Sequence, residues 1–287
     1  MLTHPGPENP TRVQITPCRV HPLDLTLRAG IPLDRAVIEA VRSAGFSAAW
    51  LWVTDAPCDQ LSYVIPGPPP GDGRVAFYSD TQVLTPKEDA LPRITAMGLH
   101  LGRGDEGPAI HAHGLWEGAR GKPHMGHLRP EETALSRDVR IAGWGIDGAI
   151  FQRMADLETG FDLFEPCRTE PAHSGGHPAR LLRLRPHLDL APTLEGLIAP
   201  SSCVMGLGSL IGAQFADAPA LPPPATEILI LDHAPPRLRI AAIGQEGRMR
   251  QDWLSGLNLV CITAELLVID LPAAQPSPGC KFQGGRS

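Results

Sequence analysis

The chain has few aromatic residues, no Cys-x-x-Cys pair, no long basic run and no apolar segment of membrane length. Aromatic residues make up 5% of the chain and hydrophobic residues 43%, so the core must be largely aliphatic. The six cysteines are scattered, which argues against a disulfide framework and against a cysteine zinc site. A net charge of −6 without a basic run argues against direct binding of nucleic acid.

The start of the chain is polar and rich in proline, and it lacks the apolar region of a signal peptide. No later run is long enough to span a bilayer. We therefore expect a reduced, cytoplasmic protein with no membrane partner. The 31 prolines and 30 glycines favour a fold with many turns and much sheet over a helical bundle.

Histidines are concentrated in one short segment. Four of the 11 histidines lie between residues 111 and 127. His111 and His113 are two residues apart, so a β-strand would point both rings to one face. The connection that follows is rich in turn residues, which suits a hairpin that brings His127 back to the same point. Three neutral imidazoles with an open fourth position are typical of catalytic zinc. We predict a zinc site at His111, His113 and His127, with His124 as an alternative third ligand.

The chain also contains a weak internal repeat. Residues 25–33 align with 182–190, and each segment alternates apolar and polar residues before a helical pattern. We expect the two helices at residues 33–44 and 191–198, each followed by a short apolar strand. The ends of the two units also correspond, because residues 138–142 resemble residues 263–269.

The histidine segment has a counterpart in the second unit. Residues 110–128 correspond to residues 239–254 with a shorter turn. In this register Ile240, Ala242 and Trp253 take the places of the three histidines. The second copy would therefore keep the strand and lose every ligand, which indicates that the fold itself does not need histidine there.

These observations divide the chain into five segments. The repeat defines two domains, and the stretch between them is rich in proline and glycine. The last residues are polar and rich in proline, as in disordered tails. We predict an N-terminal extension at 1–19, a first domain at 20–158, a linker at 159–178, a degenerate second domain at 179–271 and a disordered tail at 272–287.

The pattern resembles the PPC (plant and prokaryote conserved) domain. The resemblance is carried by the strand-then-helix opening at residues 25–41, by His111-Ala112-His113 and by Gly126-His127-Leu128. The family usually ends this motif with Gly-Gly-His, and here Met125 replaces the first glycine. The second copy matches through four segments: residues 182–198, 208–210, 226–228 and 263–266.

The resemblance implies an α+β fold, with a mostly antiparallel sheet and packed helices in each domain. PPC domains tend to associate as trimers, so the resemblance implies a homo-oligomer with trimer-like packing. Acetolactate decarboxylase belongs to the same fold group and looks like an internal duplication with zinc on histidines in one half. A decarboxylase-like spacing would use His124, whereas the PPC spacing fits His127 better.

Two classes of function follow from the sequence. The first is a metal-dependent lyase or hydrolase that acts on a small molecule with a carbonyl or carboxylate group. Such an enzyme needs a proton donor, for which Glu117, Glu131 and Glu132 are candidates, and Arg129 is a candidate partner for a substrate carboxylate. The second is a non-enzymatic oligomeric module with a regulatory or DNA-associated role. Bound stoichiometric metal would favour the first class.

Overall fold

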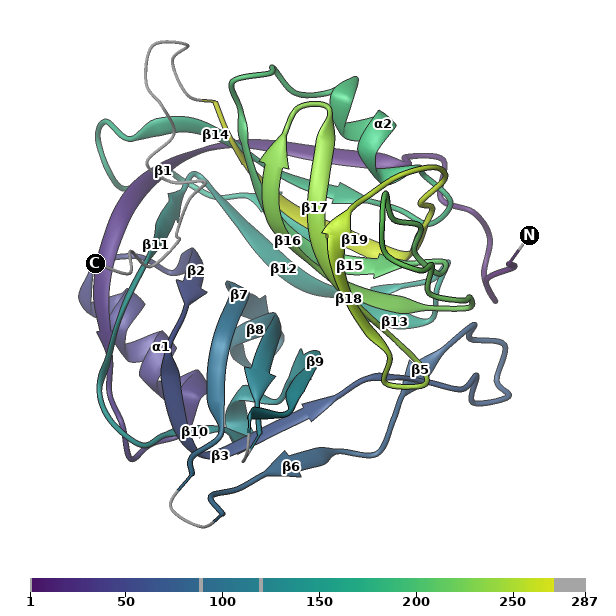
Figure 1. Ribbon diagram of the computed structural model, residues 1–287. Coiled ribbons are helices and arrows are strands. Elements are labelled where there is room, and N and C mark those ends of the chain that lie inside the picture. The colour runs from purple at the N-terminus through teal and green to yellow at the C-terminus, as the bar shows by residue number, and fades with distance from the viewer. Residues whose placement is uncertain (1, 88–89, 119–120, 271–287) are drawn as a thin grey trace.

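The computed structural model describes residues 2–87, 90–118 and 121–270 of the protein. Most of this part is antiparallel β-sheet (Figure 1). Its two α-helices are α1 (Leu33–Ser43) and α2 (Leu190–Glu195). The prediction of a mostly antiparallel sheet is confirmed, but the described part is β-rich and holds less helix than the predicted α+β class implies. None of its helices is both long and apolar enough to cross a bilayer.

The strands of residues 13–147, here called the first half, pair in a simple order. Each strand is antiparallel to the next. The order is β1 (Val13–Leu27), β11 (Val139–Asp147), β2 (Ala48–Val53), β7 (Arg93–Gly104), β8 (Gly107–Glu117) and β9 (Pro123–Leu128).

The strands of residues 177–269, here called the second half, pair in the equivalent order, again antiparallel. The order is β14 (His177–Leu184), β19 (Val260–Ile269), β15 (Cys203–Leu210), β16 (Thr226–Ala234), β17 (Arg237–Gly244) and β18 (Met249–Trp253). In both halves a helix follows the first strand of the sequence. The last strand of each half lies in the sheet between the first two strands and pairs with both. Strand β1 also pairs with β14, so it arcs along both halves (Figure 1).

The remaining elements extend these sheets. Strand β3 pairs with β6, β7, β9 and β10, while β4 and β5 form a separate small sheet. Strands β12 and β13 form a hairpin. The bounds are β3 (Ala56–Val64), β4 (Pro66–Gly67), β5 (Phe77–Tyr78), β6 (Gln82–Leu84), η2 (a 3₁₀ helix, Pro130–Glu132), β10 (Ala134–Leu135), β12 (Ala149–Asp156) and β13 (Phe161–Arg168).

Two segments that the sequence predicts as irregular contain strand. Strand β1 begins at Val13, inside the predicted extension, because its first residues pair with β14. Strand β13 occupies residues 161–168 of the predicted linker, where it pairs with β12 and buries Leu163 and Phe164. Pro166 lies within this strand, so the proline- and glycine-rich composition of the stretch does not exclude strand. The predicted tail lies outside the described residues.

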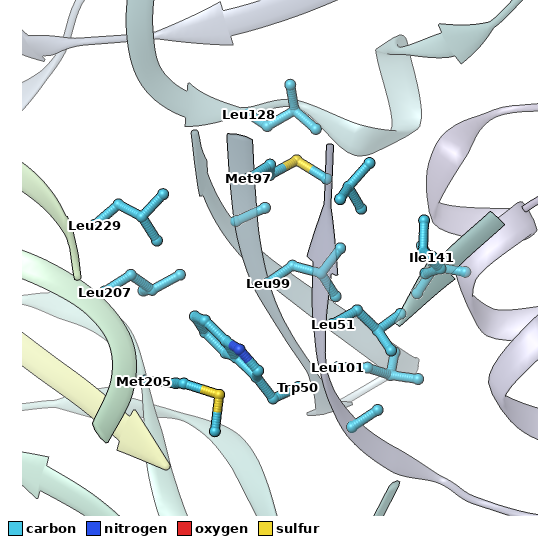
Figure 2. Packing of buried hydrophobic residues seen from close by; sticks show 14 of the residues in the cluster. Trp50, Leu51, Met97, Leu99, Leu101, Leu128, Ile141, Met205, Leu207 and Leu229 are labelled. Atoms are coloured by element: carbon cyan, nitrogen blue, oxygen red, sulfur yellow. The ribbon is translucent and has the colours of Figure 1, made fainter. Parts of the chain in front are cut away.

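One hydrophobic core is shared by the two halves. Trp50, Leu51 and Leu99 of the first half belong to the same buried cluster as Leu207 and Leu229 of the second (Figure 2). Each fully buried large apolar side chain contributes roughly 1.5–3 kcal/mol to the stability of the fold. The two halves are thus packed on each other by the same force that stabilises each one.

The sheet of the second half is buried on both faces. Its other face packs Leu182, Val204 and Leu266 against Leu194 of α2. Strands with two buried faces read as continuous apolar runs, as the sequences of β16 and β19 do. A glutamate interrupts each run, and side-chain alternation places Glu227 and Glu265 on the same face as Leu229 and Leu267, toward the first half.

A histidine in the shared core makes the stability of the protein depend on pH. His100 is fully buried between the rings of Trp50 and Phe151, and its Nε2 donates to the Glu265 carbonyl at 3.1 Å. Burial lowers the pKa of His100 to about 4, below the unfolded value of 6.5. The neutral ring therefore stabilises the fold fully above the unfolded pKa, and this contribution is lost as pH falls from 6.5 toward 4.

We expect the metal-free protein to lose about 3 kcal/mol of unfolding free energy through this residue as the pH falls across that window. In the His100→Gln variant this part of the acid sensitivity should disappear. Urea unfolding of both metal-free proteins, at neutral pH and near the folded pKa, measures the difference. Equal losses in the two proteins would contradict the expected titration.

Candidate metal centre

The histidines converge through the pairing of two neighbouring strands. His111 and His113 lie on β8, and His113 is the direct Cα partner of His127 on β9. One ring nitrogen from each of the three histidines lies within 4.8 Å of the others. The hairpin expected from the glycine-rich connection is confirmed, and it brings the three predicted ligands together.

Hydrogen bonds fix the tautomers of two of these rings. Nδ1 of His113 lies 2.8 Å from the backbone carbonyl of Ile228, which can only accept, so Nδ1 carries the proton. Nδ1 of His111 lies 2.6 Å from a carboxylate oxygen of Glu265 and donates to it in the same way. In the neutral rings the lone pair is therefore on Nε2 of both histidines.

Those two lone pairs face each other. The Nε2 atoms of His111 and His113 are 3.2 Å apart. Two nitrogen ligands on one tetrahedral zinc, each about 2.05 Å from it, would lie about 3.3 Å apart. A cation between the two atoms would turn a repulsive contact into a bound one. In addition, Nδ1 of His127 is buried without a hydrogen-bond partner among the described residues. The residues present therefore fit a bound metal ion.

The surroundings favour the neutral form of two of the rings. Burial, followed by the charge of His111, lowers the pKa of His113 well below 6.5. The same two causes, with the charges of His113 and Arg129, lower the pKa of His127 well below 6.5. Metal ligands must be deprotonated, so neither ring needs to lose a proton near neutral pH to bind a cation.

Two carboxyl groups reach the histidines from the second half. Glu265 of β19 is fully buried; besides His111, it accepts from the backbone N–H of Phe164 at 3.3 Å. Glu227 of β16 places Oε1 4.0 Å from Nε2 of His113, and its Oε2 is buried with no partner among the described residues. Burial raises the pKa of Glu227 to about 8, although a hydrogen bond from the backbone of His127 lowers the pKa in part. The site is thus built by both halves.

Two cavities open onto the histidines. The small one has a volume of about 70 Å³ and is lined by all three histidines and by Glu227. The larger has a volume of about 440 Å³ and is lined by His111, His127 and Glu265, together with three arginines. A metal ion at the histidines would have space for a ligand on both sides.

Solved structures with a similar fold were found. One is a metal-containing protein from Archaeoglobus fulgidus, 22% identical, with a TM-score of 0.38 over 50% of this chain and 93% of its own. Another is a PPC protein from Pyrococcus horikoshii, 15% identical, with a TM-score of 0.36 over 54% of this chain and 97% of its own. A third, from Ralstonia eutropha and proposed to bind DNA, is 14% identical, with a TM-score of 0.39 over 50% of this chain and 89% of its own.

A PPC protein is thus among the structural neighbours, and each match covers about half of this chain. No protein-family model matches the sequence, and no curated protein matches it.

The alternative third ligand lies apart from the cluster. His124 is three residues before His127 on β9, and its Nδ1 is 2.8 Å from the hydroxyl of Tyr63. Strand alternation places residues an odd number apart on opposite faces, so His124 and His127 point to different sides of the hairpin. His124 therefore stays outside the group of three histidines in the described residues.

Only some of the residues predicted to act as proton donors or to bind a carboxylate line a cavity. Glu117 is exposed at the end of β8 and lines neither cavity described above. Arg129 and Glu131 both line the larger cavity, but they form an ion pair with each other at 2.8 Å. Arg129 also pairs with Glu132 at 2.9 Å. Of the four predicted residues, Arg129 and Glu131 can thus contact a ligand in the larger cavity.

The predicted correspondence between the second hairpin and the histidine hairpin is wrong at Trp253. In the first half His113 pairs with His127, whereas in the second half Ala242 pairs with Arg250 and Trp253 pairs with Arg239. Trp253 therefore does not occupy the place equivalent to His127. Paired residues are 14 apart in the first hairpin (113 and 127) and 8 apart in the second (242 and 250), so the second turn is six residues shorter, whereas the register expected from the sequence shortens it by only three.

Proposed function

We propose that this protein binds zinc at His111, His113 and His127 and uses it as a lyase or hydrolase on a small carbonyl or carboxylate compound. The contact at 3.2 Å between the Nε2 atoms of His111 and His113 supports the proposal most strongly, because the Nδ1 protons of both rings are donated to other groups. Bound zinc would polarise a carbonyl or carboxylate oxygen, or lower the pKa of a water molecule.

Other residues of the site orient the ligand histidines and can transfer a proton. His113 is held by a backbone carbonyl and His111 by a buried carboxylate, which fixes the orientation of both rings. Glu227 lines the same small cavity as the three histidines, so its carboxyl group can hold or release a proton beside a bound ligand. On this geometry Glu227 replaces Glu117 as the candidate proton donor. The rings of Tyr78 and His127 lie 5.1 Å apart, which places an aromatic side chain beside this ligand.

Turnover by matched proteins tests this function. Zinc-loaded protein and its His127→Ala variant would be assayed against a panel of small oxo acids for release of carbon dioxide and against small esters for hydrolysis. The proposal predicts turnover of at least one compound by the zinc-loaded protein, lost on chelation and absent from the variant. Stoichiometric zinc without any zinc-dependent turnover across the panel would contradict the enzymatic function and favour the non-enzymatic regulatory module.

We also propose that the two halves are tandem copies of one PPC-like unit. The support is the repeated strand order, β1-β11-β2-β7-β8-β9 in the first half and β14-β19-β15-β16-β17-β18 in the second. In this arrangement the second copy has lost the histidines and contributes two glutamates to the site of the first. The copy that lacks the histidines thus supplies the carboxyl groups next to the histidines of the other copy.

Association of chains is a further expectation of this arrangement. Closed symmetry is the usual outcome for soluble oligomers. Exposed apolar side chains, such as Met154 within β12 and Leu157 just after it, are also available for contact with another chain. We expect light scattering to give a trimer or a multiple with trimer-like packing. A single species at 30.7 kDa, the mass of one chain, would contradict this.

A further inference from the structure

The two cavities meet at the histidines and share one aromatic wall. Both are lined by His111 and His127, and both are lined by Phe77, Tyr78 and Phe161. The small cavity, about 70 Å³, holds roughly two groups of the size of a water molecule. The end of a ligand that contacts the metal on that side must therefore be compact, and the rest of the ligand must lie in the larger cavity.

Three guanidinium groups line the larger cavity: those of Arg74, Arg129 and Arg153. Arg74 lies over the Phe77 ring at 4.3 Å and pairs with Asp72 at 2.6 Å. Arg129 forms ion pairs with both Glu131 and Glu132. Arg153, on β12, forms no ion pair among the described residues, so its charge is the one most available to a ligand.

The acidic groups that line the same cavity are Glu131, Asp162 and Glu265. Glu265 is buried and already accepts from His111 and from the backbone of Phe164. Glu131 is paired with Arg129. Asp162 is the remaining carboxylate of the lining. Arg153 and Asp162 are therefore the two charged groups of the lining that form no ion pair among the described residues, and Arg153 is the one that can donate to an anionic ligand.

We propose that the site takes a small organic dicarboxylate, with one carboxylate at the metal and the other on Arg153. This inference rests on the proposed zinc site and specifies its ligand. The compact cavity beside the histidines accepts the first carboxylate, and the second lies in the open cavity, where guanidinium and carboxylate can form a two-point hydrogen bond. The methylene groups between them would contact the aromatic wall of Phe77 and Phe161.

A chain-length series tests the proposal. Zinc-loaded protein would be titrated by calorimetry with acetate, malonate, succinate and glutarate. We expect one dicarboxylate to bind at least tenfold more tightly than acetate, and Arg153→Gln to weaken that dicarboxylate about tenfold while acetate changes less than twofold. The matched control is Arg103→Gln, which removes an exposed arginine that lines neither cavity and contacts Gln152.

Zinc content measured on the same samples separates the two hypotheses. If the wild-type protein holds zinc and binds acetate but shows no preference for any dicarboxylate, the ligand assignment is overturned and the zinc site stands. Equal effects of Arg153→Gln and Arg103→Gln would also overturn it, because the charge would then act only at long range. If the wild-type protein holds no zinc, the zinc site and the ligand assignment fail together.

Discussion

The His113→Ala variant is expected to fold and to contain no stoichiometric zinc. The side chain of His113 is 3% exposed, and its Nε2 is one of the two atoms that face each other across 3.2 Å. Removing it leaves two imidazoles, and we expect the affinity for zinc to fall at least 100-fold, by analogy with other lost contacts at metal sites. The cost to stability is the lost packing and the lost hydrogen bond to the Ile228 carbonyl, about 2–4 kcal/mol.

The matched control for this variant is His124→Ala. His124 comes from the same hairpin and is also hydrogen-bonded, but its partner is the Tyr63 hydroxyl. It should keep full zinc occupancy. Metal analysis by mass spectrometry and circular dichroism would be carried out on both variants. Full zinc in folded His113→Ala, or loss of zinc from both variants alike, would show that this group of histidines does not hold the metal.

The second large effect is expected at Glu265, which no ligand-spacing rule identifies. Its carboxylate accepts from Nδ1 of His111 at 2.6 Å and is fully buried, so it fixes the tautomer that presents Nε2 to the metal. In Glu265→Gln the shape is kept and the negative charge is lost. We expect zinc affinity to fall 10- to 100-fold, as is typical when such a supporting group is changed.

Competition with a chromophoric chelator would measure that affinity. Glu246→Gln is the control, since Glu246 is an exposed glutamate of the second half that pairs with Arg248. An affinity of Glu265→Gln equal to that of the control would mean that the carboxylate does not orient His111 toward a metal. A loss of affinity without loss of unfolding free energy would separate this role from a structural one.

The histidine hairpin is predictable from sequence because its determinants are local. Strand alternation places His111 and His113 on one face, and the turn residues between them and His127 close the hairpin. The same holds for α1, whose predicted span, residues 33–44, differs from the observed one by one residue at its end. Local periodicity carries enough information for elements of this kind.

The glutamates of the site are not predictable in the same way. Glu265 is 154 residues from the histidine that it supports, and the contact depends on how two halves pack. A signal was present nevertheless, because a single glutamate inside the apolar runs of β16 and β19 requires a buried partner. Strand β13 escaped prediction for a related reason: it forms by pairing with β12, and prolines and glycines around it suggested a linker.

X-ray absorption at the zinc edge of the loaded protein measures directly whether the three histidines bind the metal. We expect one zinc per chain with three imidazole nitrogens at about 2.0–2.1 Å. The imidazole scattering should decrease in His113→Ala and stay unchanged in His124→Ala. A spectrum without imidazole ligands, or one that is identical in both variants, would contradict a zinc centre formed by His111, His113 and His127.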